Sequence, residues 1–135
     1  MTQLAELKTL VARGDARGRL AVAQLGTELP FVARRVYWIH GAKPGIRRGF
    51  HAHKRLNQLF VCVAGSCKVT LSDGKREETI DMTAFGSALS VGPGLWRVIS
   101  DLSPDCVLMV LADRPYEEDD YIRDFAAFKE ASVHG

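Results

Sequence analysis

The chain has 135 residues and a formal net charge of +2, with 47% hydrophobic and 25% charged residues. This length and composition are typical of one globular domain, so we expect residues 1–135 to form a single domain. No apolar run approaches the ~20 residues that a membrane-spanning helix needs. The first eight residues lack the apolar core and cleavage site of a secretory signal, which favours a cytoplasmic protein.

Charge is distributed unevenly along the chain. Residues 1–60 hold 11 Lys and Arg against 3 Asp and Glu, whereas residues 61–135 hold 7 against 13. The basic half could attract a phosphate-bearing partner, or the two halves could neutralise each other in the folded protein. No basic run is interleaved with aromatic residues, so a nucleic acid partner is not expected. The three cysteines form no C-x-x-C pair and are typical of core residues in a reducing cytosol.

Short segments with β character follow one another through the middle of the chain, separated by Gly, Pro and Asp. Predicted strands cover residues 19–24, 35–40, 58–63, 68–71, 78–82, 88–91, 97–100 and 106–111. The run 58–63 is almost wholly apolar, which is typical of a strand buried on both faces. Asp73 and Gly74 favour a tight hairpin turn, because glycine accepts a positive φ. About eight strands with regular turn signals indicate an all-β fold, a closed barrel or jelly roll.

Only the C-terminal segment has helical character. Asp119 and Asp120 could cap the start of a helix, and Tyr121, Phe125 and Phe128 then fall at i, i+4 and i+7 on one face. We expect this face to pack against the barrel or a neighbouring subunit, and not to bind a ligand.

The segment 45–65, GIRRGFHAHKRLNQLFVCVAG, carries the clearest chemical signal. His51 and His53 are two residues apart, so both point to the same face of a strand. Histidine exchanges protons near neutral pH, since its ordinary pKa is ~6.5. Two histidines on one strand face therefore suit proton transfer between adjacent carbons. The alternative is that both are interior histidines with a structural role.

The spacing of this segment resembles the first motif of the cupin barrels. Gly45, His51, His53 and Gly65 all fall at the motif positions. Metal-binding cupins have a glutamate where this chain has Gln58, and a third histidine where it has Arg97. Gln is a poor ligand for transition metals and Arg repels a cation. We therefore expect a site without metal or other cofactor.

Strand alternation selects further candidates. Arg35 and Tyr37 share one face of the strand 35–40, and a tyrosine inside a barrel can donate a hydrogen bond to an oxyanion. Tyr37 could instead be a wall residue. Arg48 precedes His51 in the sequence R-G-x-H and is suited to bidentate phosphate contact, or could be a surface charge. The complete candidate substrate-binding set is Arg48, Arg35, Arg17, Arg97 and Gln58.

Most of the chain resembles the dTDP-4-keto-6-deoxyglucose 3,4-ketoisomerases, including the domain found in larger bifunctional polysaccharide-biosynthesis proteins. The landmarks are DARGRLAV (15–22), RRVYWI (34–39), RRGFHAHK (47–54), VCVAGSCKVTLSDG (61–74), DCVLMVLAD (105–113) and DYIRDF (120–125). The R-G-x-H element is shared with the dTDP-sugar 3,5-epimerases, another group of metal-free cupins.

The resemblance implies a homodimer of jelly-roll barrels with exchanged N-terminal strands. It implies conversion of dTDP-4-keto-6-deoxyglucose to a 3-keto-6-deoxyhexose that an aminotransferase then uses. By analogy, His51 abstracts the C3 proton to give an enediol, and His53 relays a proton toward C4. Tyr37 assists at an oxygen, and Arg48 holds the pyrophosphate.

The product configuration at C4 and the function class stay open at this point. Within the family, arginine near position 17 is associated with galacto-type products, and arginine at the position of Arg97 with gluco-type products; this chain has both. One alternative function is a non-catalytic dTDP-sugar-binding module. Another is a metal-dependent cupin oxygenase, against which Gln58 and Arg97 argue.

Overall fold

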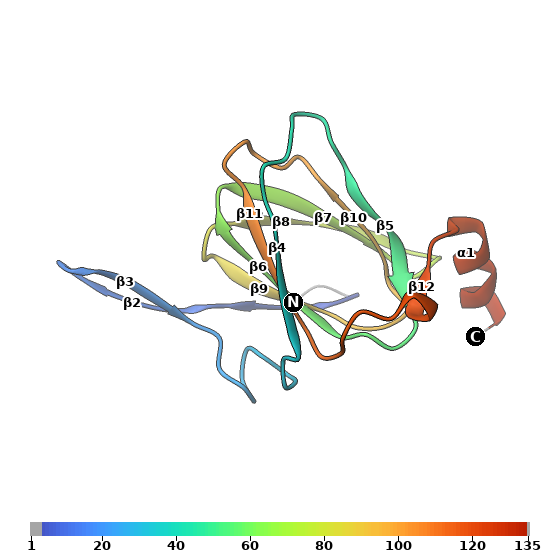
Figure 1. The fold of residues 1–135 in the computed structure, drawn as a ribbon, viewed down its shortest axis with the longest axis horizontal. Coiled ribbons are helices and arrows are strands. Elements are labelled where there is room, and N and C mark those ends of the chain that lie inside the picture. The colour runs from blue at the N-terminus through green and yellow to red at the C-terminus, as the bar shows by residue number, and fades with distance from the viewer. Residues whose placement is uncertain (1–3, 135) are drawn as a thin grey trace.

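A computed structural model describes residues 4–134 of the chain, and its main body is a sandwich of two five-stranded antiparallel sheets (Figure 1). The first sheet contains, in order, β1 (Glu6–Thr9), β9 (Ser87–Val91), β6 (Gln58–Ala64), β11 (Val107–Ala112) and β4 (Arg35–Ile39). The second contains β12 (Tyr121–Ile122), β5 (Arg48–His53), β10 (Trp96–Ser100), β7 (Ser66–Ser72) and β8 (Glu77–Thr83). The predicted all-β jelly roll is confirmed, as two facing sheets that are not joined into one closed barrel.

The core lies between the two sheets. Alternate residues of facing strands enter it, among them Val69 and Leu71 of β7 and Leu108 and Val110 of β11, all with 0% exposure. This alternation is the period-two pattern that distinguishes the inner from the outer face of a strand. Each of the eight predicted strands overlaps a strand of the structure.

Strand β6 is buried on both of its faces, as its apolar run predicts. Its inner face contributes Phe60 and Cys62 to the main core. Its outer face contributes Leu59 and Val61 to a second cluster, which includes Leu10 and residues of the chain between β3 and β4. The N-terminal part of the chain therefore covers the back of the first sheet.

The N-terminal strands differ from the prediction. Residues 19–24 were expected to form the first strand of the barrel, but β1 precedes them and joins the first sheet beside β9. The strand that overlaps them, β3 (Gly18–Val22), pairs with β2 (Val11–Asp15) in a hairpin arm that projects away from the sandwich (Figure 1). Every residue of β2 is exposed, so neither face of the strand needs apolar side chains. Its sequence, VARGD, therefore lacks the apolar alternation by which a strand is predicted.

The C-terminal segment begins its helix later than predicted. Residues Glu118–Asp120 form the short 3-10 helix η1, β12 follows, and α1 spans Phe125–His134. The predicted cap at Asp119 and Asp120 is wrong: the carboxylate of Asp124 accepts the Ala126 N–H at 3.1 Å. The residue at 121 pairs with β5 instead of starting a helix. No helix within residues 4–134 has the length and apolarity to span a bilayer.

Two other local predictions are confirmed. The rings of Phe125 and Phe128 pack on Trp96 of β10, with centroids 5.0 and 5.7 Å away, so the helix does cover the second sheet. Gly74 has a φ of 95° in the connection between β7 and β8. There Asp73 Oδ1 accepts the N–H of Lys75, which fixes the turn.

Replacing Gly65 by alanine should destabilise the protein more than the same change at Gly41. Both glycines have nearly the same positive φ, 66° and 67°. A Cβ on Gly65 would lie 2.9 Å from the Cα of Cys106, whereas one on Gly41 meets nothing within 4 Å. The conformational cost, about 1–2 kcal/mol, is common to both. Overpacking should add about 1–3 kcal/mol at Gly65 only.

Urea unfolding of the two variants and the parent chain measures this difference. Equal losses of unfolding free energy would show that the close approach of Gly65 to the Cys106 backbone is relieved without cost.

Candidate active site

A cavity of about 620 Å³ opens between β4 and β5 and is bounded by β6, β10 and β12. Five arginines line it: Arg35, Arg47, Arg48, Arg97 and Arg123. Among the described residues, no Asp or Glu side chain lines it. A concave site with one sign of charge attracts ligands of the opposite charge, so this cavity suits an anion.

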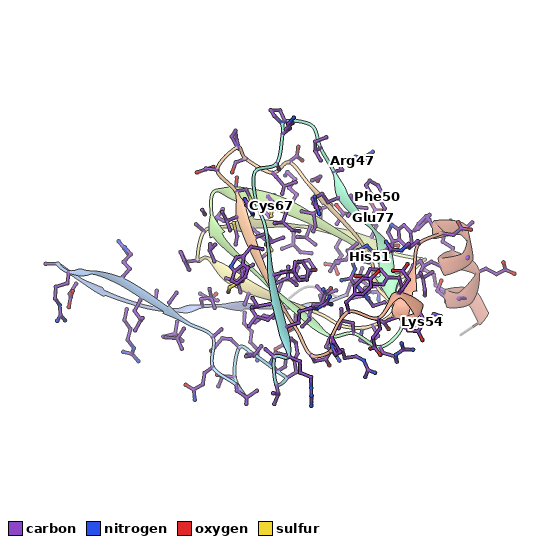
Figure 2. The ribbon with its side chains drawn as sticks, in the orientation of Figure 1. Arg47, Phe50, His51, Lys54, Cys67 and Glu77 are labelled. Atoms are coloured by element: carbon purple, nitrogen blue, oxygen red, sulfur yellow. The ribbon has the colours of Figure 1, made fainter. Side chains whose placement is uncertain are left out.

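A β-bulge in β5 shapes the wall of the cavity. Arg97 pairs with His51 and Val98 with Gly49, which leaves Phe50 without a partner at the bulge. Gly49 has a φ of 98°, and a Cβ there would lie 2.7 Å from the carbonyl oxygen of Arg97. The glycine of the R-G-x-H sequence is thus required by both conformation and space. Figure 2 shows Phe50 and His51 on this strand and Lys54 just beyond its end.

His51 has one ring nitrogen fixed and the other free to act as a base. Its Nδ1–H donates to the carbonyl oxygen of Gly49 at 3.0 Å, since a carbonyl can only accept. Nε2 therefore carries the lone pair in the neutral ring. Burial, together with the nearby Arg97 and Arg123, lowers the pKa of His51 to about 4, although the hydrogen bond to Gly49 raises it. His51 is neutral at pH 7.

His53 lies buried beside His51, with the two ring centroids 4.9 Å apart at 88°. Its Nδ1–H donates to the Asp120 carboxylate at 2.8 Å, and its Nε2 has no hydrogen-bond partner among the described residues. Burial and then Arg97 lower the pKa of His53 to about 4, although Asp120 raises it. Burial alone would raise the pKa of Asp120, but the bonds from His53 and the Arg55 N–H hold it below its ordinary value.

A chain of three side chains runs under the cavity. Arg97 is 1% exposed; its guanidinium donates to the Leu95 carbonyl oxygen at 3.0 Å and to Gln58 Oε1. The Gln58 Nε2–H in turn donates to the Tyr37 hydroxyl at 3.0 Å. Because arginine is only a donor, it fixes the orientation of the Gln58 amide, and the Tyr37 oxygen must accept. The Tyr37 proton therefore stays available to a ligand.

Most of the predicted site residues meet at this cavity. Arg35, Tyr37, Arg48, His51, Gln58 and Arg97 all line it, and His53 lies directly behind His51. Burial raises the pKa of Tyr37, so its phenol keeps its proton. Arg35 Nε is buried without a hydrogen-bond partner among residues 4–134, so its N–H is available to an anion.

Arg17 is the exception. It lies in the turn of the β2–β3 arm, far from β5 (Figure 1). Its guanidinium donates to the carboxylate of Asp15, the last residue of β2, at 2.6 Å. The side chain is 90% exposed. Within one protomer the structure does not bring Arg17 to the cavity.

The sequence interpretation missed Asp120, Tyr121 and Arg123. Tyr121 was assigned to a packing face of the helix, but it belongs to β12 and its ring lies 4.9 Å from His51 and 4.5 Å from His53. Arg123 lies over this ring at 4.1 Å. The available signal was the alternation Tyr-Ile-Arg, which puts residues 121 and 123 on one side of an extended segment.

The positions of two metal ligands in the cupin frame are occupied by a hydrogen-bonded amide and guanidinium. Arg97 has no electron pair to offer a metal, and Gln58 Oε1 already accepts a hydrogen bond from the Arg97 guanidinium. Within residues 4–134 no group of three or more His, Cys, Asp or Glu side chains is placed to hold a metal ion. Metal independence remains a prediction that chelation can test.

Comparisons with known proteins identify the family of this chain. A family of proteins described as "FdtA: WxcM-like, C-terminal" matches residues 2–133. A "TDP-4-oxo-6-deoxy-alpha-D-glucose-3,4-oxoisomerase" of Aneurinibacillus thermoaerophilus is 48% identical over 117 residues, covering 85% of this chain and 83% of that protein. This chain belongs to the FdtA family.

Solved structures of 3,4-ketoisomerases superpose closely on this chain. The 3,4-ketoisomerase QdtA of Thermoanaerobacterium thermosaccharolyticum, a histidine-to-asparagine variant in complex with TDP-4-keto-6-deoxyglucose, has a TM-score of 0.93 and 32% identity. The match covers 99% of this chain and 97% of QdtA. The TDP-quinovose 3,4-ketoisomerase WlaRB of Campylobacter jejuni has a TM-score of 0.89 and 35% identity, covering 96% and 99%.

The free energy of unfolding of this FdtA-family chain should rise with pH between about 4 and 6.5. Both histidines have a pKa of about 4 in the folded protein and 6.5 as the ordinary value, so the unfolded chain binds more protons in this window. Their contribution to stability is present above 6.5 and is lost as the pH falls toward 4. Urea unfolding across pH 4.5 to 7.5 measures the slope.

Asparagine at either position should reduce this slope. The matched control is His40→Asn, because His40 is exposed just beyond the end of β4. A slope that is unchanged in both His51→Asn and His53→Asn would mean that the two rings are not buried in the neutral form.

Proposed function

We propose that this chain is a sugar-nucleotide 3,4-ketoisomerase that converts dTDP-4-keto-6-deoxy-D-glucose to a dTDP-3-keto-6-deoxyhexose. The observation that carries the proposal is a pair of neutral imidazoles set beside a cavity whose charged side chains are all arginines. Its support from relatives is the 48% identity to an oxoisomerase of that sugar nucleotide. The 3-keto product would then serve synthesis of a 3-amino-3,6-dideoxyhexose.

The arginines suit the diphosphate of such a substrate. Arg48, Arg47 and Arg35 line the same cavity as His51, and guanidinium groups bind phosphate oxygens in bidentate pairs. Arg97 is different: it is buried under the cavity and its hydrogen bonds are to Gln58 and Leu95. We therefore assign diphosphate binding to the arginines that are not buried, with Arg48 as the principal contact, and a place beside the sugar to Arg97.

The chemistry needs proton transfer and no oxidant. His51, through the free Nε2, would take the C3 proton of the substrate, and the C4 oxygen would gain a proton to give an enediol. Tyr37 would donate to that oxygen, since its oxygen accepts from Gln58 and its proton is free. His53 would relay the proton toward C4, and Asp120 would stabilise the imidazolium formed.

We further propose a homodimer in which the N-terminal strands are exchanged. The β2–β3 arm leaves the sandwich with Val11 and Leu20 exposed by 42% and 58%, and the outer face of β4 leaves Trp38 exposed by 53%. Apolar side chains in such positions are typical of a protein interface. The exchange would let Arg17 of one protomer reach the cavity of the other.

The remaining proposals concern context. Residues 1–135 would act as one catalytic domain that needs no metal or cofactor. Cys62, Cys67 and Cys106 are buried free thiols, which is compatible with a cytoplasmic enzyme.

Incubation with dTDP-4-keto-6-deoxyglucose in D₂O, followed by NMR of the sugar, tests the reaction. Deuterium should enter at C3, a 3-keto product should form, and its C4 configuration distinguishes galacto from gluco. His51→Asn should lower the rate by ~10²–10⁴-fold, the range of general acid–base catalysis. Chelation should have no effect.

The matched control is again His40→Asn, which should keep full activity. Binding of dTDP without exchange or product would identify a binding module in place of an enzyme. Loss of activity on chelation, restored by a transition metal, would identify a metal-dependent cupin.

Mixed dimers test the exchanged arm. Arg17→Glu should lower kcat/KM by at least ~10-fold, since a hydrogen bond between charged groups is worth about 1.5–3 kcal/mol. A dimer of one Arg17→Glu and one His51→Asn protomer should then regain one working site, because one cavity receives both intact residues. No recovery on refolding the two variants together would show that the arm does not act between protomers.

A further inference from the structure

We propose that Tyr121 is a second residue that handles a substrate oxygen: its phenol serves one of the two adjacent oxygens of the reacting sugar, and Tyr37 serves the other. The inference rests on the proposed isomerisation. Tyr121 is distant from the histidines in sequence, and the pairing of β12 with β5 places it beside them.

The reaction itself requires two oxygen partners. When C3 loses its hydrogen, the oxygen on C4 gains a proton; when C4 gains a hydrogen, the oxygen on C3 loses its proton. The C3–H and O3–H bonds break, the C4–H and O4–H bonds form, and no oxidant or reductant is consumed. Two imidazoles can serve the carbons, but two neighbouring oxygens still need a donor and an acceptor.

Tyr121 is held at the histidines by the backbone. It pairs with His53 across the β5–β12 ladder, and the Lys54 N–H donates to the Asp120 carbonyl oxygen at 2.9 Å just before it. Its half-buried ring lines the cavity and contacts both imidazoles, at 4.9 Å from His51 and 4.5 Å from His53. A side chain so placed meets any ligand that reaches His51.

The surroundings of Tyr121 leave its hydroxyl available to a ligand. Arg97, at the base of the cavity, interacts electrostatically with both Tyr37 and Tyr121. No described residue hydrogen-bonds the Tyr121 hydroxyl, so both its proton and its lone pairs are available. The two phenols thus share one cation and lie on different strands, β4 and β12.

The competing interpretation is that the ring only shields the histidines from water. Tyr121→Phe distinguishes the proposal from this interpretation, because it keeps the ring and removes the hydroxyl. The proposal predicts a fall in kcat of about 10²-fold, with unchanged dTDP affinity and thermal unfolding. Tyr116→Phe is the matched control: Tyr116 is 58% exposed and its ring lies 5.6 Å from that of Tyr121. Near-normal activity of Tyr121→Phe would refute the proposal.

Hydrogen exchange can be measured starting from the substrate and starting from the 3-keto product. The ratio of the two exchange rates would not change if Tyr121 only packed against the histidines. Enediol formation from the substrate exchanges the C3 hydrogen and needs a proton on O4. Its formation from the 3-keto product exchanges the C4 hydrogen and needs a proton on O3. If the two phenols serve different oxygens, Tyr37→Phe and Tyr121→Phe should shift the ratio of the two exchange rates in opposite directions. A ratio that stays at the parent value in Tyr121→Phe contradicts the proposal.

Measurements on the parent chain distinguish a failure of this proposal from a failure of the proposed function. Exchange and product formation by the parent, together with a normal Tyr121→Phe, would overturn only the role of Tyr121. Absence of both in the parent would overturn the isomerase itself.

Discussion

The buried guanidinium of Arg97 is the charge on which the rest of the site depends. It is 1% exposed and is held by Gln58 and the Leu95 carbonyl oxygen. A permanent charge in the interior is costly unless it is fully hydrogen-bonded, so its partners are fixed in turn. Burial lowers the pKa of Arg97 only to about 10, which leaves it charged at neutral pH.

Several properties of the cavity follow from this one charge. Arg97 contributes to the low pKa of both histidines, after burial itself, and so helps to keep both rings neutral. It orients the Gln58 amide, and through it the hydroxyl of Tyr37. It also occupies a place where metal-binding cupins have a ligand. Under the proposed function, the same fold would serve proton transfer once an amide and a guanidinium replace two ligands.

Much of the fold and the centre of the site could be predicted from the sequence, because the signals were local. The alternation of β4 identified the inward face of Tyr37, and the H-x-H spacing identified the paired imidazoles. Tyr121 and Asp120 could not be found in this way. The i, i+4, i+7 spacing of Tyr121 with the two phenylalanines fits a helix equally well, and Asp120 fits a helix cap. Only pairing with β5 decides for the strand, and the Asp120–His53 bond joins residues 67 positions apart. Long-range pairing of this kind overrides local periodicity.

The β2–β3 arm has a consequence for the order in which the protein matures. A two-stranded hairpin alone in water is at most marginally stable, and within residues 4–134 of one protomer no third strand pairs with this arm. Under the proposed exchange, each arm becomes ordered only when two chains meet. Assembly would then be a bimolecular step, so the amount of competent enzyme would depend on how much of the chain a cell makes, and dilution would remove activity before it unfolds the sandwich.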